Sequence, residues 1–201
     1  MEMFTYVKDD ASNRLFFDIL QQTWEEKFGK GIMKEVYKGE ESDKVILFND
    51  QEEGIGTFEL IPYHPTVSKM DFNFHTLSEI RRCRSVMEID KFTVLKEHAS
   101  LNAFGEAVIA MMDYSLNNNV HYYVYCIQPD LLKVLQLRYG FPIKPVGEEI
   151  LIYDPTDPTK VIGKEVPAVV DMQYLMTHLD EFKRVKRLYN RRKIILKLKR
   201  D

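Results

Sequence analysis

The pattern that most constrains the fold is a strand, a helix and a second strand between residues 86 and 128. Residues 86–95 and 121–128 carry the β-branched and aromatic side chains that are typical of strands. Between them, residues 104–117 repeat apolar side chains at helical spacing. A strand–helix–strand unit implies a right-handed crossover, so we expect the two strands to lie parallel in one sheet.

An amphipathic helix is predicted near the start of the chain, over residues 12–28. Ser12 is available as its N-cap, and Gly29 and Gly31 favour its end. Five further elements are predicted: a hairpin with arms at 44–49 and 54–63, a loop with a short helix over 72–83, a short helix from Pro129 to a C-cap at Gly140, a strand over 150–154, and a final helix from about residue 170. This order predicts an α/β fold with a mixed central sheet and helices on both faces.

The strand at 86–95 carries charges where a covered strand should be apolar. Because side chains alternate along a strand, Glu88 and Asp90 should point to one face and Lys91 to the other. A buried unpaired charge is costly, so these groups must be paired or must line a cleft. One interpretation is a strand end that reaches water or an internal network with the arginines of residues 81–84. The other is an active-site cleft in which Glu88 accepts a proton from a nucleophile.

Small residues follow this strand, in the stretch Asn102–Ala107, where we expect a loop to lead into the helix. The exposed N–H groups of a helix N-terminus bind phosphate oxygens. A bulky side chain at Gly105 or Ala107 would hold an anionic ligand away from the backbone. The stretch is therefore a candidate phosphate site.

These residues resemble the cofactor motif of the GNAT superfamily of N-acyltransferases, Gln/Arg-x-x-Gly-x-Gly/Ala. Asn102 stands at its first position, and Gly105 and Ala107 match the small residues. The downstream Leu-Arg-Tyr-Gly-Phe matches the Gly-Phe pair that ends a helix in this family. The family's tyrosine acid, four residues before that glycine, is replaced by Gln136.

A narrower resemblance is to acyl-homoserine-lactone synthases and the related N-acyl amino acid synthases, which share the GNAT fold. The runs RYGFPIKPVGEEI and VIGKEVPAVV are similar to segments of the lactone synthases. Those enzymes use acyl carrier protein thioesters and S-adenosylmethionine. Leu20, Thr57 and Lys91 stand where they carry arginines.

The resemblance implies acyl transfer from acyl-CoA or an acyl carrier protein to a primary amine, without a metal. Together with the charges of the strand at 86–95 and the aromatic side chains of the strand at 121–128, it predicts three groups of site residues: catalytic Glu88, Asp90 and Lys91; cofactor-binding Phe92, Thr93, Val94, Asn102, Ala103, Phe104, Gly105 and Ala107; and substrate-binding Trp24, Asp43 and Tyr125. The thioester would lie between the two parallel strands, with a backbone N–H near Phe92 or Thr93 at the oxyanion. A non-catalytic sensor that binds an acyl thioester or a fatty acid is the alternative.

The charges are distributed unevenly along the chain. Of 28 Lys and Arg and 31 Asp and Glu, ten basic and one acidic side chain lie in residues 183–201, which leaves 18 basic and 30 acidic in the rest. We therefore divide the chain into an acyltransferase domain, 1–170, and a basic helical extension, 171–201. The extension is either a solvated face or a docking surface for an acidic partner such as an acyl carrier protein. Nucleic-acid binding is disfavoured by the acidic body.

Other classes of protein are also disfavoured. No apolar run reaches the roughly 18–20 residues that cross a bilayer, and the N-terminus lacks the features of a signal peptide. Two cysteines, Cys83 and Cys126, suggest neither a disulfide nor a metal site, and the five histidines show no ligand spacing. A reducing cytoplasm is the expected location.

Overall fold

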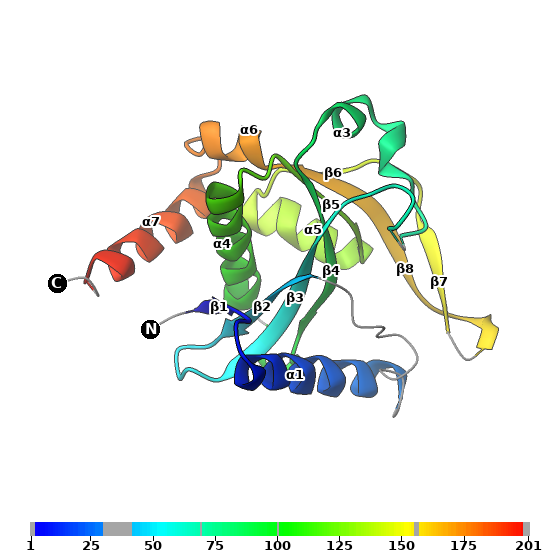
Figure 1. Ribbon diagram of the computed structural model, residues 1–201, viewed down its shortest axis with the longest axis horizontal. Coiled ribbons are helices and arrows are strands. Elements are labelled where there is room, and N and C mark those ends of the chain that lie inside the picture. The colour runs from blue at the N-terminus through cyan, green and yellow to red at the C-terminus, as the bar shows by residue number, and fades with distance from the viewer. Residues whose placement is uncertain (1–2, 30–41, 69, 100, 155–156, 199–201) are drawn as a thin grey trace.

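The computed structural model describes residues 3–29, 42–68, 70–99, 101–154 and 157–198 (Figure 1). The strands are β1 (Phe4–Tyr6), β2 (Asp43–Phe48), β3 (Gly54–Pro62), β4 (Val86–Val94), β5 (Tyr122–Ile127), β6 (Ile143–Pro145), β7 (Ile150–Asp154) and β8 (Asp157–Asp171). The α-helices are α1 (Asp10–Phe28), α3 (Ser78–Arg82), α4 (Leu101–Asn118), α5 (Pro129–Val134), α6 (Met172–Thr177) and α7 (Lys183–Leu198). A π-helical turn, Leu135–Tyr139, extends α5 to a C-cap at Gly140.

The strands form a mixed sheet in the order β1-β2-β3-β4-β5-β8-β6, and β7 pairs with β8 beside this path. β4 and β5 are parallel, while the other neighbours are antiparallel. The predicted parallel pair, the hairpin of β2 and β3, and the α/β class are thus confirmed.

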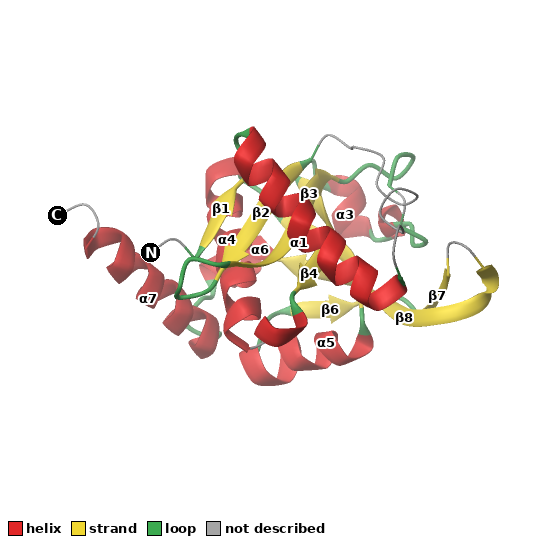
Figure 2. Ribbon diagram, turned by 90° about the horizontal axis from the view of Figure 1, so that it is seen from below, coloured by secondary structure: helices red, strands yellow, loops and turns green. Residues whose placement is uncertain are grey.

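Helices cover the two faces of the sheet (Figures 1 and 2). On one face, Val108 and Met112 of α4 belong to the same buried cluster as Phe58 and Leu60 of β3. On the opposite face, Phe16 and Leu20 of α1 pack with Ile46 of β2. Since side chains alternate along a strand, Ile46 points away from the α4 layer to which Val45 and Leu47 belong.

A gap opens in the middle of the sheet, between β4 and β5. The two strands pair only from Val86–Tyr122 to Glu88–Val124. Beyond that point β4 stays paired with β3 up to Val94, and β5 stays paired with β8 up to Ile127. The two strands therefore diverge past Glu88, and this divergence leaves room for a ligand.

β4 contains a bulge at the start of this gap. Glu59 pairs with Asp90 and Thr57 pairs with Thr93, so β4 has one residue more than β3 over this interval. Lys91 adopts the left-handed conformation, with φ at 51°. The predicted alternation is wrong here: Lys91 turns back to the face of Asp90 and Glu59, because the extra residue breaks the two-residue period.

The cap of α1 differs from the prediction. Asp9, not Ser12, is the N-cap, and Ser12 is the third helical residue of a capping box. Gly29 ends the helix with φ at 97°, as expected, whereas Gly31 lies outside the described residues.

α4 begins earlier than predicted, at Leu101, so the expected loop of residues 102–107 forms the first turns of the helix. The connection from β4 is made instead by a 3-10 turn, Lys96–His98. The side chain of Asn102 is outside the described part of the structure.

β8 was not predicted. Its outer half pairs with β7 into a hairpin that extends beyond the main sheet (Figure 2). β1 and β6, each of three residues, were not predicted either. The single helix predicted from about residue 170 is two helices, α6 and α7. Within the described residues, no helix is long and apolar enough to cross a membrane.

Candidate active site

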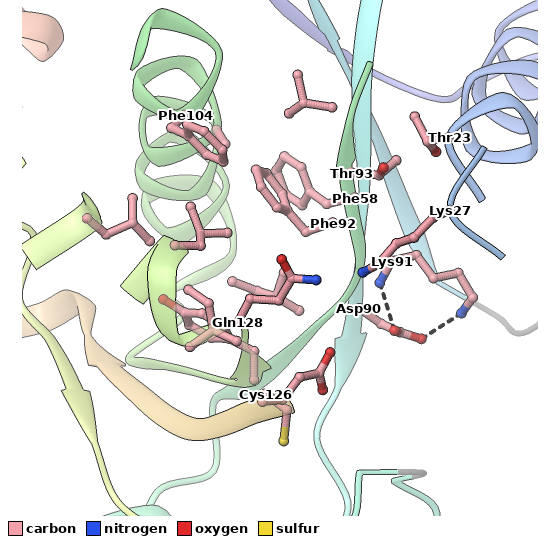
Figure 3. Close-up of a pocket in the computed structure, with 18 of the residues that line it drawn as sticks. Thr23, Lys27, Phe58, Asp90, Lys91, Phe92, Thr93, Phe104, Cys126 and Gln128 are labelled. Atoms are coloured by element: carbon pink, nitrogen blue, oxygen red, sulfur yellow. Dashed lines mark hydrogen bonds and ion pairs between the residues drawn. The ribbon is translucent and has the colours of Figure 1, made fainter. Parts of the chain in front are cut away.

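A cavity of about 580 Å³ lies at the gap between β4 and β5 (Figure 3). Thr23, Trp24 and Lys27 of α1 line it from one face of the sheet, and Phe104 and Ala107 of α4 line it from the other. Because α1 and α4 cover opposite faces, the cavity passes through the sheet. The two sides differ in chemistry.

The α4 side of the cavity is apolar. The ring centroid of Phe92 lies 6.1 Å from that of Phe58 and 5.6 Å from that of Phe104. The remaining apolar lining on this side comes from α4, β5 and the segment after it: Ala107, Val108, Met111, Tyr125, Ile127, Leu131, Leu135 and Phe141. Such a wall suits an aliphatic chain, whose burial is favourable in proportion to its apolar area.

The α1 side of the cavity carries charges, with Lys27, Asp90, Lys91 and Glu165 in its wall. Figure 3 shows Lys27 reaching from α1 towards Asp90 and Lys91 of β4, Thr23 beside Thr93, and Phe104 across the cavity. Apolar and charged walls thus meet where the two strands separate.

Three side chains form a buried ionic cluster at the bulge. The Nζ of Lys91 lies 2.6 Å from Oδ2 of Asp90 and 3.0 Å from Oε2 of Glu59. The side chains of Lys91 and Glu59 are 7% and 0% exposed, and that of Asp90 is 38% exposed. Burial would lower the pKa of Lys91, but attraction to Asp90 and Glu59 outweighs it and raises the pKa. Lys91 is therefore held as a cation, and only Asp90 of the two acids lines the cavity.

Glu88 is buried beside the gap but is not part of the cavity wall. It lies between Ile61 of β3 and Val124 of β5 in the sheet. Burial is the main cause of the raised pKa of Cys126, which lines the cavity, and Glu88 is close enough to add a small electrostatic contribution. Glu88 is thus close to the site without forming its surface.

The predicted cofactor-binding residues fall into two groups. Phe92, Thr93, Val94, Phe104 and Ala107 line the cavity; Ala103 and Gly105 are buried near it in the first turns of α4. A Cβ at Gly105 would lie 3.1 Å from Cδ1 of Leu188, so this glycine faces α7. The small size of Gly105 therefore allows α4 and α7 to pack closely.

Two of the three predicted substrate-binding residues, Trp24 and Tyr125, line the cavity. Asp43 does not: it is exposed at the start of β2, and its carboxylate accepts a short hydrogen bond from the hydroxyl of Tyr114. Asp43 therefore lies on the α4 side of β2, away from the gap.

Sequence reasoning missed Lys27, Cys126 and Glu165. Burial raises the pKa of Cys126 to about 12, so its thiol is protonated near neutral pH. Burial also raises the pKa of Glu165, against the opposing effect of Lys27. Lys27 could have been predicted, because it lies three residues after Trp24 and therefore on the same face of the helix. Glu165 could not, because the strand β8 that carries it was not recognised.

Comparisons with known proteins identify the fold. No protein-family model and no curated protein sequence matches the chain. Among solved structures, FeeM, an N-acyl amino acid synthase from uncultured soil microbes, is 16% identical with a TM-score of 0.59, over 85% of this chain and 90% of FeeM. BjaI, a CoA-dependent acyl-homoserine lactone synthase solved with SAM and isopentyl-CoA, is 16% identical with a TM-score of 0.58, over 94% of this chain and 88% of BjaI.

The AHL synthase LasI is also similar, at 14% identity and a TM-score of 0.54, over 84% of this chain and 90% of LasI. At these identities the comparisons concern the fold. The fold expected from the Asn102–Ala107 motif and the Gly-Phe pair is confirmed. The chain has the α/β fold of GNAT-like acyltransferases, in the form shared by acyl-homoserine lactone and N-acyl amino acid synthases.

Proposed function

We propose that the protein transfers an acyl group from a thioester to the primary amine of a small acceptor. The observation that carries the proposal is the cavity through the sheet, apolar on the α4 side and charged on the α1 side. A thioester carbonyl placed in the gap would direct its acyl chain to the apolar side and meet an amine from the charged side. The solved structures of similar fold include synthases that make such amides.

The reaction requires no covalent intermediate on the protein. The amine nitrogen attacks the thioester carbonyl, a tetrahedral intermediate forms, and its collapse breaks the C–S bond and releases the thiol. The bulge places the backbone of Phe92 and Thr93 beside the gap, where an N–H would stabilise the oxyanion. Asp90, fixed by Lys91, supplies negative charge next to the incoming ammonium. Glu88 does not line the cavity, so it could reach the incoming ammonium only through a water and not directly.

The donor is a coenzyme A thioester or the thioester of an acyl carrier protein, which share the phosphopantetheine arm. Phe104 of α4 and Ala99 before it line the cavity, so the arm would enter along the first turns of α4. The amides and dipole of this helix end favour the phosphates of the arm.

The basic helix α7 adds a reason to include the carrier protein among the donors. α7 packs against the start of α4 through Leu188. Four basic side chains of α7 are exposed: Lys183, Arg184, Arg187 and Arg191. Burial raises the pKa of Tyr139, and the nearby charges of Arg138 and Arg184 oppose that shift. The ring of Tyr139 lies 3.7 Å from a Cβ placed at Gly105, so both arginines are close to the start of α4. Positive charge thus gathers beside the proposed entrance, where an acidic carrier would dock.

A non-catalytic sensor remains the second candidate, on one observation. Gln136, at the position of the family's tyrosine acid, donates a hydrogen bond of 2.9 Å to the carbonyl of Ile143. Its amide stabilises the turn after α5 and supplies no acid for the leaving thiolate. A sensor would bind the thioester and release no thiol.

A melting series followed by an assay tests both candidates. We would measure the melting temperature with coenzyme A, acetyl-CoA, octanoyl-CoA, octanoyl-acyl carrier protein and S-adenosylmethionine. A ligand at about 100 times its Kd adds roughly 2.7 kcal/mol to the free energy of unfolding. Thiol release from the stabilising thioester, on addition of mixed amino acids, would support transfer. Binding with no thiol release would support the sensor, and no binding of any thioester would contradict both.

A further inference from the structure

Glu165 occupies a distinctive position in the wall of the cavity. On β8, Val166 pairs with Ile127 of β5, whereas Glu165 pairs with Ile150 of β7. Glu165 therefore sits where β8 leaves the main sheet to form the outer hairpin. Its half-buried side chain lines the charged side of the cavity.

Charged and titratable groups face Glu165 from every side. Lys27 comes from α1, Asp90 from β4, Cys126 from β5, and Asp71 from the segment before the 3-10 turn Phe74–Thr76. Burial is the main cause of the raised pKa of Glu165; Lys27 opposes the shift, and Asp90 and Asp71 add to it. A carboxylate with a raised pKa accepts a proton more readily near neutral pH than an ordinary glutamate.

The other carboxylates near the gap are less accessible to an amine in the cavity. Both oxygens of Asp90 already accept hydrogen bonds, Oδ1 from the N–H of Lys91 at 2.7 Å and Oδ2 from its Nζ. Glu59 is fully buried behind Lys91, and Glu88 does not line the cavity. Glu165 makes no hydrogen bond and no ion pair within 4 Å with the described residues, so its oxygens are available to a ligand.

We propose that Glu165 is the proton acceptor for the attacking amine, an inference that rests on the acyl transfer proposed above. The acceptor enters as an ammonium ion, and its first proton passes to the carboxylate of Glu165. The neutral nitrogen then forms the C–N bond. On collapse, the C–S bond breaks, the second proton leaves the nitrogen for the thiolate, and the products are the amide and the free thiol. Glu165 returns its proton to solvent.

Three variants test this role: Glu165→Gln, Glu165→Asp and, as a control, Glu149→Gln. Glu149 is an exposed acid next to the start of β7, paired with Lys164 at 3.1 Å and outside the cavity wall. The assay measures thiol release from octanoyl-CoA and from octanoyl-acyl carrier protein with two nucleophiles. One is a mixture of the amino acids without cysteine, whose own thiol would be detected in the assay; these enter as ammonium ions. The other is hydroxylamine, which is already unprotonated at neutral pH.

Glu165→Gln should lower transfer to the amino acids by about 100-fold or more, the usual contribution of a general base. Transfer to hydroxylamine should fall only a few-fold, since no proton need be removed before attack. In the wild type, the rate should fall as the pH drops through the raised pKa of Glu165; Glu165→Gln should lose that limb. Glu165→Asp should retain part of the activity, and Glu149→Gln all of it.

Two results would overturn the role of Glu165 while leaving the function in place: an unchanged rate in Glu165→Gln, or an equal loss with both nucleophiles. The second result would indicate that Glu165 only shapes the cavity. Absence of thiol release by the wild type from either donor would refute acyl transfer itself, and the role of Glu165 with it. The melting temperature of each variant, with and without octanoyl-CoA, verifies that it folds and binds the donor.

Discussion

At the scale of single residues, Lys91 links the fold to the site. A non-glycine residue with positive φ is strained, and such conformations persist only where the surroundings hold them. Here the ion pairs with Asp90 and Glu59 hold the ammonium in place on the face opposite α4. Lys91 therefore secures the bulge that turns the end of β4 and fixes Asp90 in the cavity wall.

Removing the charge of Lys91 should destabilise the protein. Lys91→Met would leave Glu59 buried without this cation, and breaking a buried pair costs about 3–5 kcal/mol. Chemical denaturation would measure the loss. The double variant Lys91→Met/Glu59→Gln should recover much of it, because the buried charge is then removed as well. An unchanged denaturation midpoint for Lys91→Met would show that the cluster does not stabilise the bulge.

At the scale of elements, the sequence predicted what local periodicity determines. The β4–α4–β5 unit and the β2–β3 hairpin have strong apolar patterns, and they were found at nearly their observed bounds. β8 escaped prediction because Thr159, Lys160 and Lys164 of its outer half are exposed and interrupt any apolar pattern; only pairing with β7 makes it a strand. The bulge escaped because it depends on the register with β3 and on the ion pairs of Lys91.

The close approach of β3 to β4 beside the bulge gives a test at this scale. A Cβ at Gly56 would lie 2.6 Å from the carbonyl oxygen of Thr93, which is backbone and cannot rotate away. Gly56→Ala should therefore push β4 at the cavity wall and cost about 1–3 kcal/mol, the usual cost of overpacking. Gly163→Ala on β8 is the matched control, since nothing lies within 4 Å of its added Cβ. Equal melting temperatures for the two variants would contradict the contact.

At the scale of the whole molecule, the site is assembled from segments far apart in the sequence. Phe104 and Ala107 were identified from the Asn102–Ala107 motif, and residues 92–94 from the strand before it; all line the cavity. Lys27 and Glu165 belong to segments that only the tertiary fold brings to β4 and β5. Asp43 was carried over from a resemblance, but Tyr114 engages it on the other side of β2. Local patterns thus predict the donor side better than the acceptor side.

Because the basic side chains are concentrated on α7, transfer from an acyl carrier protein should depend on them, whereas transfer from coenzyme A should not. Arg184, Arg187 and Arg191 are exposed, so changing all three to Gln should leave the fold intact. An acidic carrier protein would lose about 0.5 kcal/mol per surface charge pair. For the triple variant this is about 1.5 kcal/mol, or roughly a tenfold drop in transfer from octanoyl-acyl carrier protein. Transfer from octanoyl-CoA should change little, because no protein surface docks.

Salt supplies the matching control for this prediction. Wild-type transfer from the carrier protein should weaken as ionic strength rises, whereas the triple variant, having lost those charges, should respond less. Lys8→Gln removes an exposed charge near the start of α1 instead of on α7 and should behave as the wild type. An equal drop with both donors would place these arginines at the phosphates that the donors share. No drop with either would leave α7 as a solvated basic helix, and coenzyme A as the better-supported carrier of the acyl group.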